Sequence, residues 1–137
     1  MKKKKEVMVV GKRKLAVAKA IVRKGKGMVR FNRAPLEALE SEMLRLMLEE
    51  PLILAGDVAK GVDIDITVKG GGKVGQVEAA RQSIALGLVE FTGDAKLKEI
   101  FENYDKNLLK VDWRRTEPHK PSRSSQGPRR HKQRSKR

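Results

Sequence analysis

The chain has 137 residues, and its 32 Lys or Arg against 17 Asp or Glu give a formal net charge of +15 at pH 7. It contains no cysteine, which excludes disulfides, thiolate metal sites and cysteine nucleophiles and fits a reducing cytoplasmic environment. No stretch approaches the roughly 18 consecutive apolar residues of a membrane-spanning helix, so the surplus of positive charge indicates nucleic acid, and not a membrane, as the partner.

The start of the chain predicts three short strands. The charge run Lys2–Lys5 precedes them and suits either a solvated terminus or an RNA contact. The segments Val7–Val10, Ala16–Val22 and Met28–Phe31 are apolar or alternating in the way that is typical of strands. Gly25–Gly27 predicts a hairpin turn between the last two, because glycine accepts positive φ without steric cost.

A first helix is expected to follow these strands. Pro35 suits its first turn and Pro51 is expected to stop it. Its apolar positions recur at helical spacing and are interpreted as core residues, the two methionines included: Leu36, Leu39, Met43, Leu46 and Met47.

The segment Val62–Val68 is the cleanest strand pattern in the chain. Its apolar residues alternate strictly, so one face of the strand is expected to be buried. Asp63 and Asp65 occupy the other face, where they are interpreted as a solvated pair and not as an acid–base or metal site.

Two more helices are predicted after this strand. The first runs from Val74 to about Phe91 and ends at Gly93; its expected buried stripe is Val74, Val77, Ala80, Ile84 and Leu88, with Gln76, Arg81 and Gln82 outside. The second is capped by Asp94, and its apolar positions are Leu97, Ile100, Phe101, Tyr104 and Leu108. Because strands and helices do not alternate regularly, this order predicts an α+β fold with helices packed on one face of a mixed or antiparallel sheet.

A glycine-rich loop, Gly70–Gly75, joins the strand to the helix. It matches the dinucleotide-binding pattern G-x-G-x-x-G. A dinucleotide-binding fold also requires that the helix lead to a second parallel strand ending in an acidic residue, and this sequence shows neither. A nucleotide-dependent enzyme therefore stays only as an alternative. The unpaired N–H groups beside Gly71, Gly72 and Lys73 instead suit a phosphate, which can belong to RNA.

A basic cluster, formed by Lys12, Arg13 and Lys14, lies between the first two strands. It suits either a solvated turn or a phosphate contact. Catalysis has little support, because both histidines lie in the C-terminal tail and no spacing indicates a metal site or a cofactor. Tyr104 and Trp113 have rings that can stack on bases, but both are expected to pack against the body.

The last 24 residues, Arg114–Arg137, contain no Ala, Val, Ile, Leu, Met, Phe, Trp, Tyr or Cys. Ten of them are Lys or Arg and one, Glu117, is acidic, so the segment carries +9 of the net charge. With nothing apolar to bury, it cannot offset the roughly 1–2 kcal/mol per residue that ordering the backbone costs. The sequence therefore predicts a globular body, residues 1–113, followed by an extended basic tail, residues 114–137.

Taken together, these residues resemble the universal small-subunit ribosomal protein family number nine. Gly11–Ala18 is similar to the family motif G-R-R-K-x-x-V-A, with Lys12 in place of an arginine. Gly70–Ala85 is similar to the longer signature G-G-G-x-x-G-Q and the helix that follows it. Asp112–Pro121 resembles the archaeal branch, and Ser135–Arg137 resembles the family's terminal S-K-R or S-Y-R.

The resemblance implies a body of the ribosomal S-five second-domain type, bound to 16S-type rRNA in the head of the small subunit among neighbouring ribosomal proteins. It also implies that the tail follows rRNA to the anticodon stem-loop of the P-site tRNA, contacted by Ser135, Lys136 and Arg137. The tail residues implied to bind rRNA phosphates are Arg114, Arg115, Arg123, Arg129, Arg130, Lys132 and Arg134. A free-standing, nonspecific nucleic-acid binder is the remaining alternative.

Overall fold

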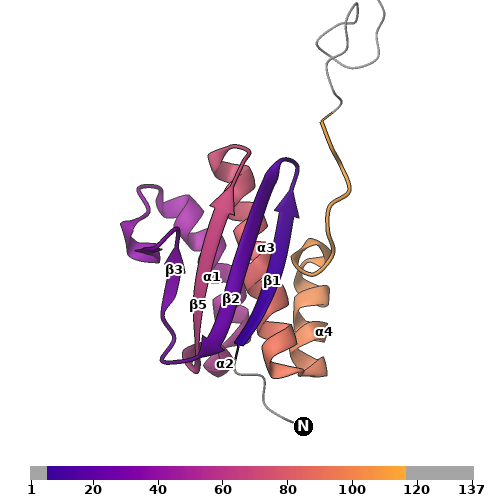
Figure 1. Ribbon diagram of the computed structural model, residues 1–137. Helices are drawn as coiled ribbons and strands as arrows, with labels where there is room; N and C mark the ends of the chain where they lie inside the picture. Colours follow the sequence, from indigo (N-terminus) through magenta and orange to yellow (C-terminus); the bar gives the residue numbers. More distant parts are fainter. Residues whose placement is uncertain (1–5, 117–137) are drawn as a thin grey trace, which may run out of the picture.

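A computed structural model describes residues 6–116 of the chain and not residues 1–5 or 117–137. Five strands form one mixed sheet, in the order β1-β2-β5-β3-β4, so the predicted α+β class is confirmed (Figure 1). The strands are β1 (Glu6–Arg13), β2 (Ala16–Lys24), β3 (Val29–Phe31), β4 (Ala34–Pro35) and β5 (Val62–Lys69). The helices are α1 (Glu42–Ala55), α2 (Asp57–Lys60), α3 (Lys73–Thr92) and α4 (Ala95–Tyr104), with 3-10 turns at Leu36–Ala38 and Lys106–Leu108.

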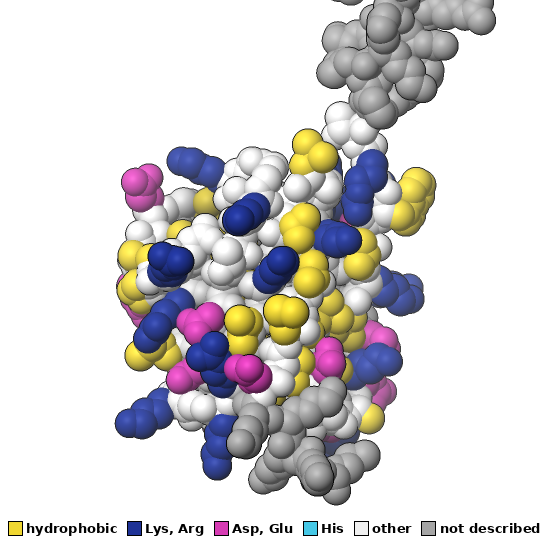
Figure 2. All heavy atoms as spheres, in the orientation of Figure 1, with side chains coloured by type: hydrophobic (Ala, Val, Ile, Leu, Met, Phe, Trp, Pro, Cys, Tyr) yellow, Lys and Arg dark blue, Asp and Glu magenta, His cyan; other side chains and the backbone are white. Residues whose placement is uncertain are grey.

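The helices cover one face of the sheet, as predicted, and the other face is open (Figure 1). α3 packs directly on β1 and β2, and α1 packs on α3. Alternation along β1 buries Val7 and Val9 beneath α3 and leaves Met8 and Val10 exposed on the open face. Figure 2 shows this face, where hydrophobic side chains lie among Lys and Arg.

The predicted hairpin at Gly25–Gly27 is wrong. β5 lies between β2 and β3: it pairs antiparallel with β2 along eight residues, from Val17 opposite Lys69 to Lys24 opposite Val62, and parallel with β3. The three-residue β3 offers far fewer pairs than β5, so β5 takes the position beside β2. β3 instead pairs with β4, across a turn at Asn32 and Arg33.

The first helix also differs from its prediction. It begins at Glu42, after a 3-10 turn, and continues through Pro51 to Ala55. Pro51 removes one backbone hydrogen bond, but it is fully buried, and this packing keeps the helix continuous. The buried residues of α1 are Leu48, Pro51 and Ala55, whereas Met43 and Leu46 are exposed and Met47 is half-buried against the core.

α3 is the central helix of the body. Val77, Ala80, Ile84 and Leu88 are buried as predicted, and Gly93 ends the helix in the left-handed conformation. Val74 is exposed, and Gln82 is only 4% exposed, contrary to both predictions. The error arises because α3 contacts the sheet on one side and α1 and α4 on the other, so its buried surface is wider than one stripe.

α4 is capped as predicted, since the Asp94 side chain accepts a hydrogen bond from the Lys96 backbone N–H at 2.9 Å. Leu97, Phe101 and Leu108 are buried. The predicted apolar positions Ile100 and Tyr104 are instead exposed. No helix in residues 6–116 is both long and apolar enough to cross a membrane.

Asp63 is not simply a solvated carboxylate. It is half-buried and accepts hydrogen bonds from the backbone N–H groups of Lys26, at 2.9 Å, and Met28, at 3.0 Å. These two bonds, the Met28 bond foremost, lower the pKa of Asp63 below its usual value of 3.8. The carboxylate therefore fixes the loop that carries the chain from β2 to β3.

We expect Asp63 to make the body sensitive to acid. Because its pKa is lower in the folded state, the stabilisation is complete above the unfolded-state pKa and is lost as pH falls through the folded value, below 3.8. Asp63→Asn should therefore flatten the decline of the melting temperature on acidification. Asp65→Asn, on the same strand face but without such loop hydrogen bonds among the described residues, is the control. Equal slopes for wild type and Asp63→Asn would contradict the assignment.

Candidate nucleic-acid interface

The glycine loop Gly70–Gly75 and the basic cluster Lys12–Lys14, both identified in the sequence, lie side by side in the structure. The pairing of Val17 with Lys69 brings the β1–β2 turn beside the residues that follow β5. Arg13, Lys14, Gly71, Gly72, Lys73 and Thr116 are among the residues that line the resulting groove of about 590 Å³. The structure thus brings together five of the six body residues predicted as phosphate ligands; Lys12 lies next to the groove in the chain but does not line it.

Two glycines allow the loop to lie against the β1–β2 turn. Gly70 and Gly71 have φ of 78° and 67°, which side-chain-bearing residues rarely adopt. A Cβ on Gly70 would lie 2.6 Å from the Leu15 carbonyl oxygen, and one on Gly71 would lie 3.0 Å from the Ala16 Cβ. Gly72 has open space around it, so its own backbone remains accessible from the groove.

The start of α3 supplies donors to this groove. Gly72 is the N-cap residue of α3, and it has no side chain that could accept a hydrogen bond from the first backbone N–H groups. The first N–H groups of a helix have no partner within it, and they carry partial positive charge. The Gln76 side chain donates to the Gly70 carbonyl at 3.0 Å and holds the loop in place. With Lys14 and Lys73 at its rim, the groove favours an anionic group such as a phosphate.

Arg13 differs from its two lysine neighbours. Its guanidinium pairs with Glu78, at 2.7 Å between Nε and Oε2, and with Asp112. Asp112 also pairs with Arg114, at 2.7 Å between Oδ2 and Nη2. Arg13 and Arg114 are therefore occupied by carboxylates of the body. Lys14 and Lys73 are exposed and form no ion pair with any described residue.

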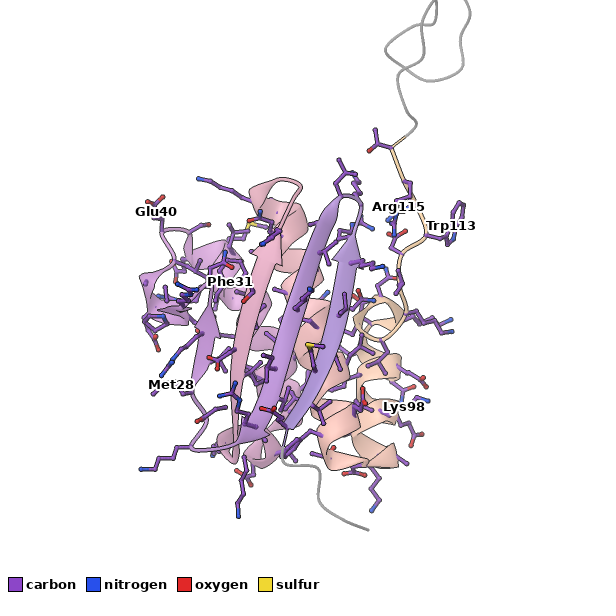
Figure 3. The ribbon with its side chains drawn as sticks, in the orientation of Figure 1. Met28, Phe31, Glu40, Lys98, Trp113 and Arg115 are labelled. Atoms are coloured by element: carbon purple, nitrogen blue, oxygen red, sulfur yellow. The ribbon has the colours of Figure 1, made fainter. Side chains whose placement is uncertain are left out.

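The root of the tail lies beside the groove. Trp113 is 85% exposed and points away from the body, so the prediction that it packs against the body is wrong (Figure 3). Arg115, also labelled in Figure 3, donates from Nη1 to the carbonyl oxygens of Asp112 and Arg114. The remaining tail residues predicted as ligands lie outside the described residues: Arg123, Arg129, Arg130, Lys132, Arg134, Ser135, Lys136 and Arg137.

Comparison with known proteins connects this arrangement to a family. The family model described as ribosomal protein S9/S16 matches residues 11–137. The chain belongs to this family. A small ribosomal subunit protein uS9 of Methanococcus vannielii is 50% identical over 131 residues, which cover 96% of this chain and 98% of the relative. The uS9 protein of Methanococcus maripaludis strain C7 shows the same identity and coverage.

The nucleotide-binding alternative is not supported in this S9 family member. α3 leads into α4, and the parallel neighbour of β5 is β3, which precedes it in the chain. The described residues thus lack the following parallel strand of a dinucleotide-binding unit. They also contain no group of three or more His, Asp or Glu that could hold a metal ion.

Sequence reasoning missed the residues that anchor the groove and the tail of this S9 family member. Arg81 pairs with Glu50, at 2.6 Å, and with Asp105, at 3.1 Å, and so ties α3 to α1 and to the end of α4. Glu78 and Asp112 orient Arg13. Helical spacing predicts Arg81 on the outside of the helix, but its side chain is only 16% exposed. Its carboxylate partners are distant in sequence, so no local pattern indicates them.

Proposed function

We propose that this chain is a structural RNA-binding protein of the small ribosomal subunit, without enzyme activity, that binds 16S-type rRNA in the head next to other ribosomal proteins. The observation that carries the proposal is the convergence of the β1–β2 turn, the glycine loop and the root of the tail on one basic groove. Membership of the S9 family and the names of the uS9 relatives support it. The proposed place of action is the cytoplasmic ribosome.

The described cations divide into two roles in this proposal. Lys14 and Lys73 contact rRNA phosphates at the groove, with Gly71 and Gly72 supplying backbone N–H groups, and Lys12 does so beside it. Arg13 and Arg114 are already paired with Asp112, and these ion pairs hold the root of the tail where it leaves the body for the RNA. The remaining N–H groups of both arginines contact phosphate. Arg115 and the basic residues of 117–137 continue the phosphate contacts along the tail.

Co-sedimentation with ribosomal subunits tests the proposal most directly. The tagged full-length chain is expected to sediment with the small subunit at near-equimolar amounts, and washing in high salt should remove unspecific excess first. A chain distributed over all cellular RNA would instead be a free-standing nonspecific binder. Saturable micromolar binding of NAD or ATP would support the enzyme alternative.

The proposed tRNA contact predicts a separate effect of the last three residues. Removing Ser135, Lys136 and Arg137 should leave subunit assembly intact and raise the dissociation rate of P-site tRNA at least about tenfold, because a hydrogen bond to a charged group contributes roughly 1.5–3 kcal/mol. Dissociation is measured on purified ribosomes carrying the shortened chain. A chain with Lys136→Gln and Arg137→Gln keeps the length of the tail and removes the charge of its end, and it is the matched control. An unchanged tRNA dissociation rate would refute the contact.

Trp113 is expected to contribute to RNA binding and not to folding. An indole that is 85% exposed stabilises the body little, whereas stacking on a base contributes roughly 1–3 kcal/mol. Trp113→Ala should leave the melting temperature unchanged and weaken binding of an rRNA fragment by roughly 5- to 150-fold. Trp113→Phe, which keeps an aromatic face, should retain most of the affinity. Wild-type affinity in Trp113→Ala would exclude stacking.

A further inference from the structure

A second cavity lies near the groove, on the other side of Arg13 and Glu78. It is smaller, about 120 Å³, and is formed by the end of β1, one side of α3, the turn after α4 and the segment that leads to the tail. Its lining is almost entirely polar or charged: Lys12, Arg13, Glu78, Arg81, Gln82, Asp105, Asn107, Lys110, Asp112 and Arg114. The function proposed above gives phosphate contacts to Lys12, Arg13 and Arg114 at the groove and the tail, but it places no ligand inside this cavity.

Gln82, one of the residues that line this cavity, has a buried donor without an acceptor. Its side chain is only 4% exposed, and its Oε1 accepts a hydrogen bond from the backbone N–H of Lys12 at 2.9 Å. A backbone N–H can only donate, so this bond fixes which end of the amide is oxygen. The Nε2 group is itself buried, and none of the described residues provides it with an acceptor.

Arg81 supplies a second buried donor. Its Nη1 and Nη2 groups are paired with Asp105 and Glu50, which hold the guanidinium in one orientation. The Nε–H is buried and has no acceptor among the described residues. An unsatisfied buried donor costs roughly 1–3 kcal/mol, so two of them on residues that line one polar cavity favour a ligand that accepts hydrogen bonds.

The charges around the cavity favour an anion. Five cations and three carboxylates line it, which leaves a surplus of +2. Each carboxylate is in an ion pair with an arginine: Glu78 and Asp112 with Arg13, and Asp105 with Arg81. Lys12 and Lys110 form no ion pair with a described residue, and both are exposed at the rim.

We infer that this cavity binds a phosphate group, with its oxygens accepting from Gln82 Nε2 and Arg81 Nε and its charge balanced by Lys12 and Lys110. Phosphate fits because it has several strong acceptor oxygens and a negative charge, which the positively charged lining favours. The assignment of this phosphate to the RNA backbone rests on the function proposed above. The inference that the cavity binds a phosphate group is independent of that function.

Titration of the isolated full-length chain with inorganic phosphate tests the site. ¹H–¹⁵N spectra are recorded at constant ionic strength, with chloride replaced by phosphate. We expect saturable shifts of the Gln82 side-chain amide and the Arg81 Nε–H signals. The Arg45 Nε–H, which pairs with Glu49 on α1, outside the cavity, is the internal control and should stay in place. Silent Gln82 and Arg81 signals, or shifts that chloride reproduces, would overturn the inference.

Two variants make the test independent of folding defects. Gln82→Glu keeps an oxygen for the Lys12 N–H but replaces the donor by an anionic oxygen, so phosphate affinity should fall at least about tenfold. Lys110→Gln changes only an exposed residue and should weaken phosphate binding, whereas Lys98→Gln, on the surface of α4 (Figure 3), should not. Equal phosphate affinity in Lys110→Gln and Lys98→Gln would refute the charge assignment.

A short oligouridine strand distinguishes the source of the phosphate. If it shifts the same two signals, an RNA phosphodiester occupies the cavity; if inorganic phosphate alone does so, the site holds the free ion. Failure of the inference is also distinct from failure of the proposed function. If the chain joins the small subunit but its Gln82 signal does not shift with phosphate, only the phosphate site is refuted. If the chain binds phosphate but not ribosomal subunits, only the proposed function is refuted.

Discussion

A chain that ends at Thr116 should fold normally and lose most of its affinity for rRNA. The segment 117–137 carries eight Lys or Arg and one Glu. Among the described residues 6–116, the buried core lies between Val7 and Leu108, and Asp112 keeps its partners Arg13 and Arg114 in the shortened chain. The body therefore keeps the packing and the ion pairs described for it, while the RNA loses its proposed cationic arm.

The size of the effect follows from counterion release. If the full-length chain meets six to ten phosphates, its affinity for an rRNA fragment should fall roughly 10³- to 10⁵-fold between about 50 and 200 mM salt. The shortened chain should show a slope of log K against log salt that is less steep by about 0.7–0.9 for each phosphate that the tail no longer neutralises. Binding isotherms at several salt concentrations measure both quantities.

Two comparison chains sharpen this test. A full-length chain with Gln at the eight cationic positions of 117–137 keeps the length and removes the charge, and it should behave like the shortened chain. A chain that ends at Trp113 also removes Arg114 and its pairing with Asp112, so its further loss of affinity measures the root of the tail. A melting temperature well below wild type in the chain ending at Thr116, or an unchanged salt slope, would contradict the division into body and tail.

Replacing Gly11 with alanine is expected to destabilise the body by about 3 kcal/mol or more. β1 lies against the backbone of α3 at this residue: a Cβ would lie 2.8 Å from the Ser83 backbone nitrogen and closer still to the Ala79 carbonyl oxygen. Backbone atoms of a central helix cannot move aside as a side-chain tip can, so β1 and α3 would have to separate. Overpacking in a rigid site typically costs roughly 1–3 kcal/mol, and more where backbone must shift.

Glycine positions elsewhere in the chain supply matched controls. Gly87→Ala would bring its Cβ to 2.6 Å from Cγ2 of Val22, a side-chain atom, and should cost less than Gly11→Ala. Gly72→Ala meets nothing within 4 Å and should change the free energy of unfolding by less than about 1 kcal/mol. Urea denaturation gives the three values. A Gly11→Ala variant as stable as Gly72→Ala would refute the close contact between β1 and α3.

The sequence predicted those parts of the fold whose determinants are local. The strict alternation of Val62–Val68 predicted β5, and glycine punctuation predicted α3 to within a residue or so at each end. The predicted hairpin at Gly25–Gly27 failed because strand pairing is a competition between distant segments. The prediction that Pro51 ends the first helix failed for a related reason, since burial against the rest of the body, and not local propensity, carries α1 through it.

The candidate site divides in the same way. The glycine loop and Lys12–Lys14 are each visible as motifs, but their meeting depends on the register of β2 against β5. Helical spacing predicts Gln82 on the outside because it cannot show that α3 is covered on two sides. The size of Trp113 favours burial, and nothing in the chain nearby shows that it points away from the body.

The central position of β5 determines the order in which this protein can fold. Only four residues separate β2 from β3 in the chain, yet the two strands join one sheet only through β5, which follows α1 and α2. A nascent chain that has not yet reached Val62 can form only two isolated strand pairs, which are marginally stable alone. Closing this long loop is an entropic barrier, so the rate-limiting folding nucleus should require the docking of β5 onto β2.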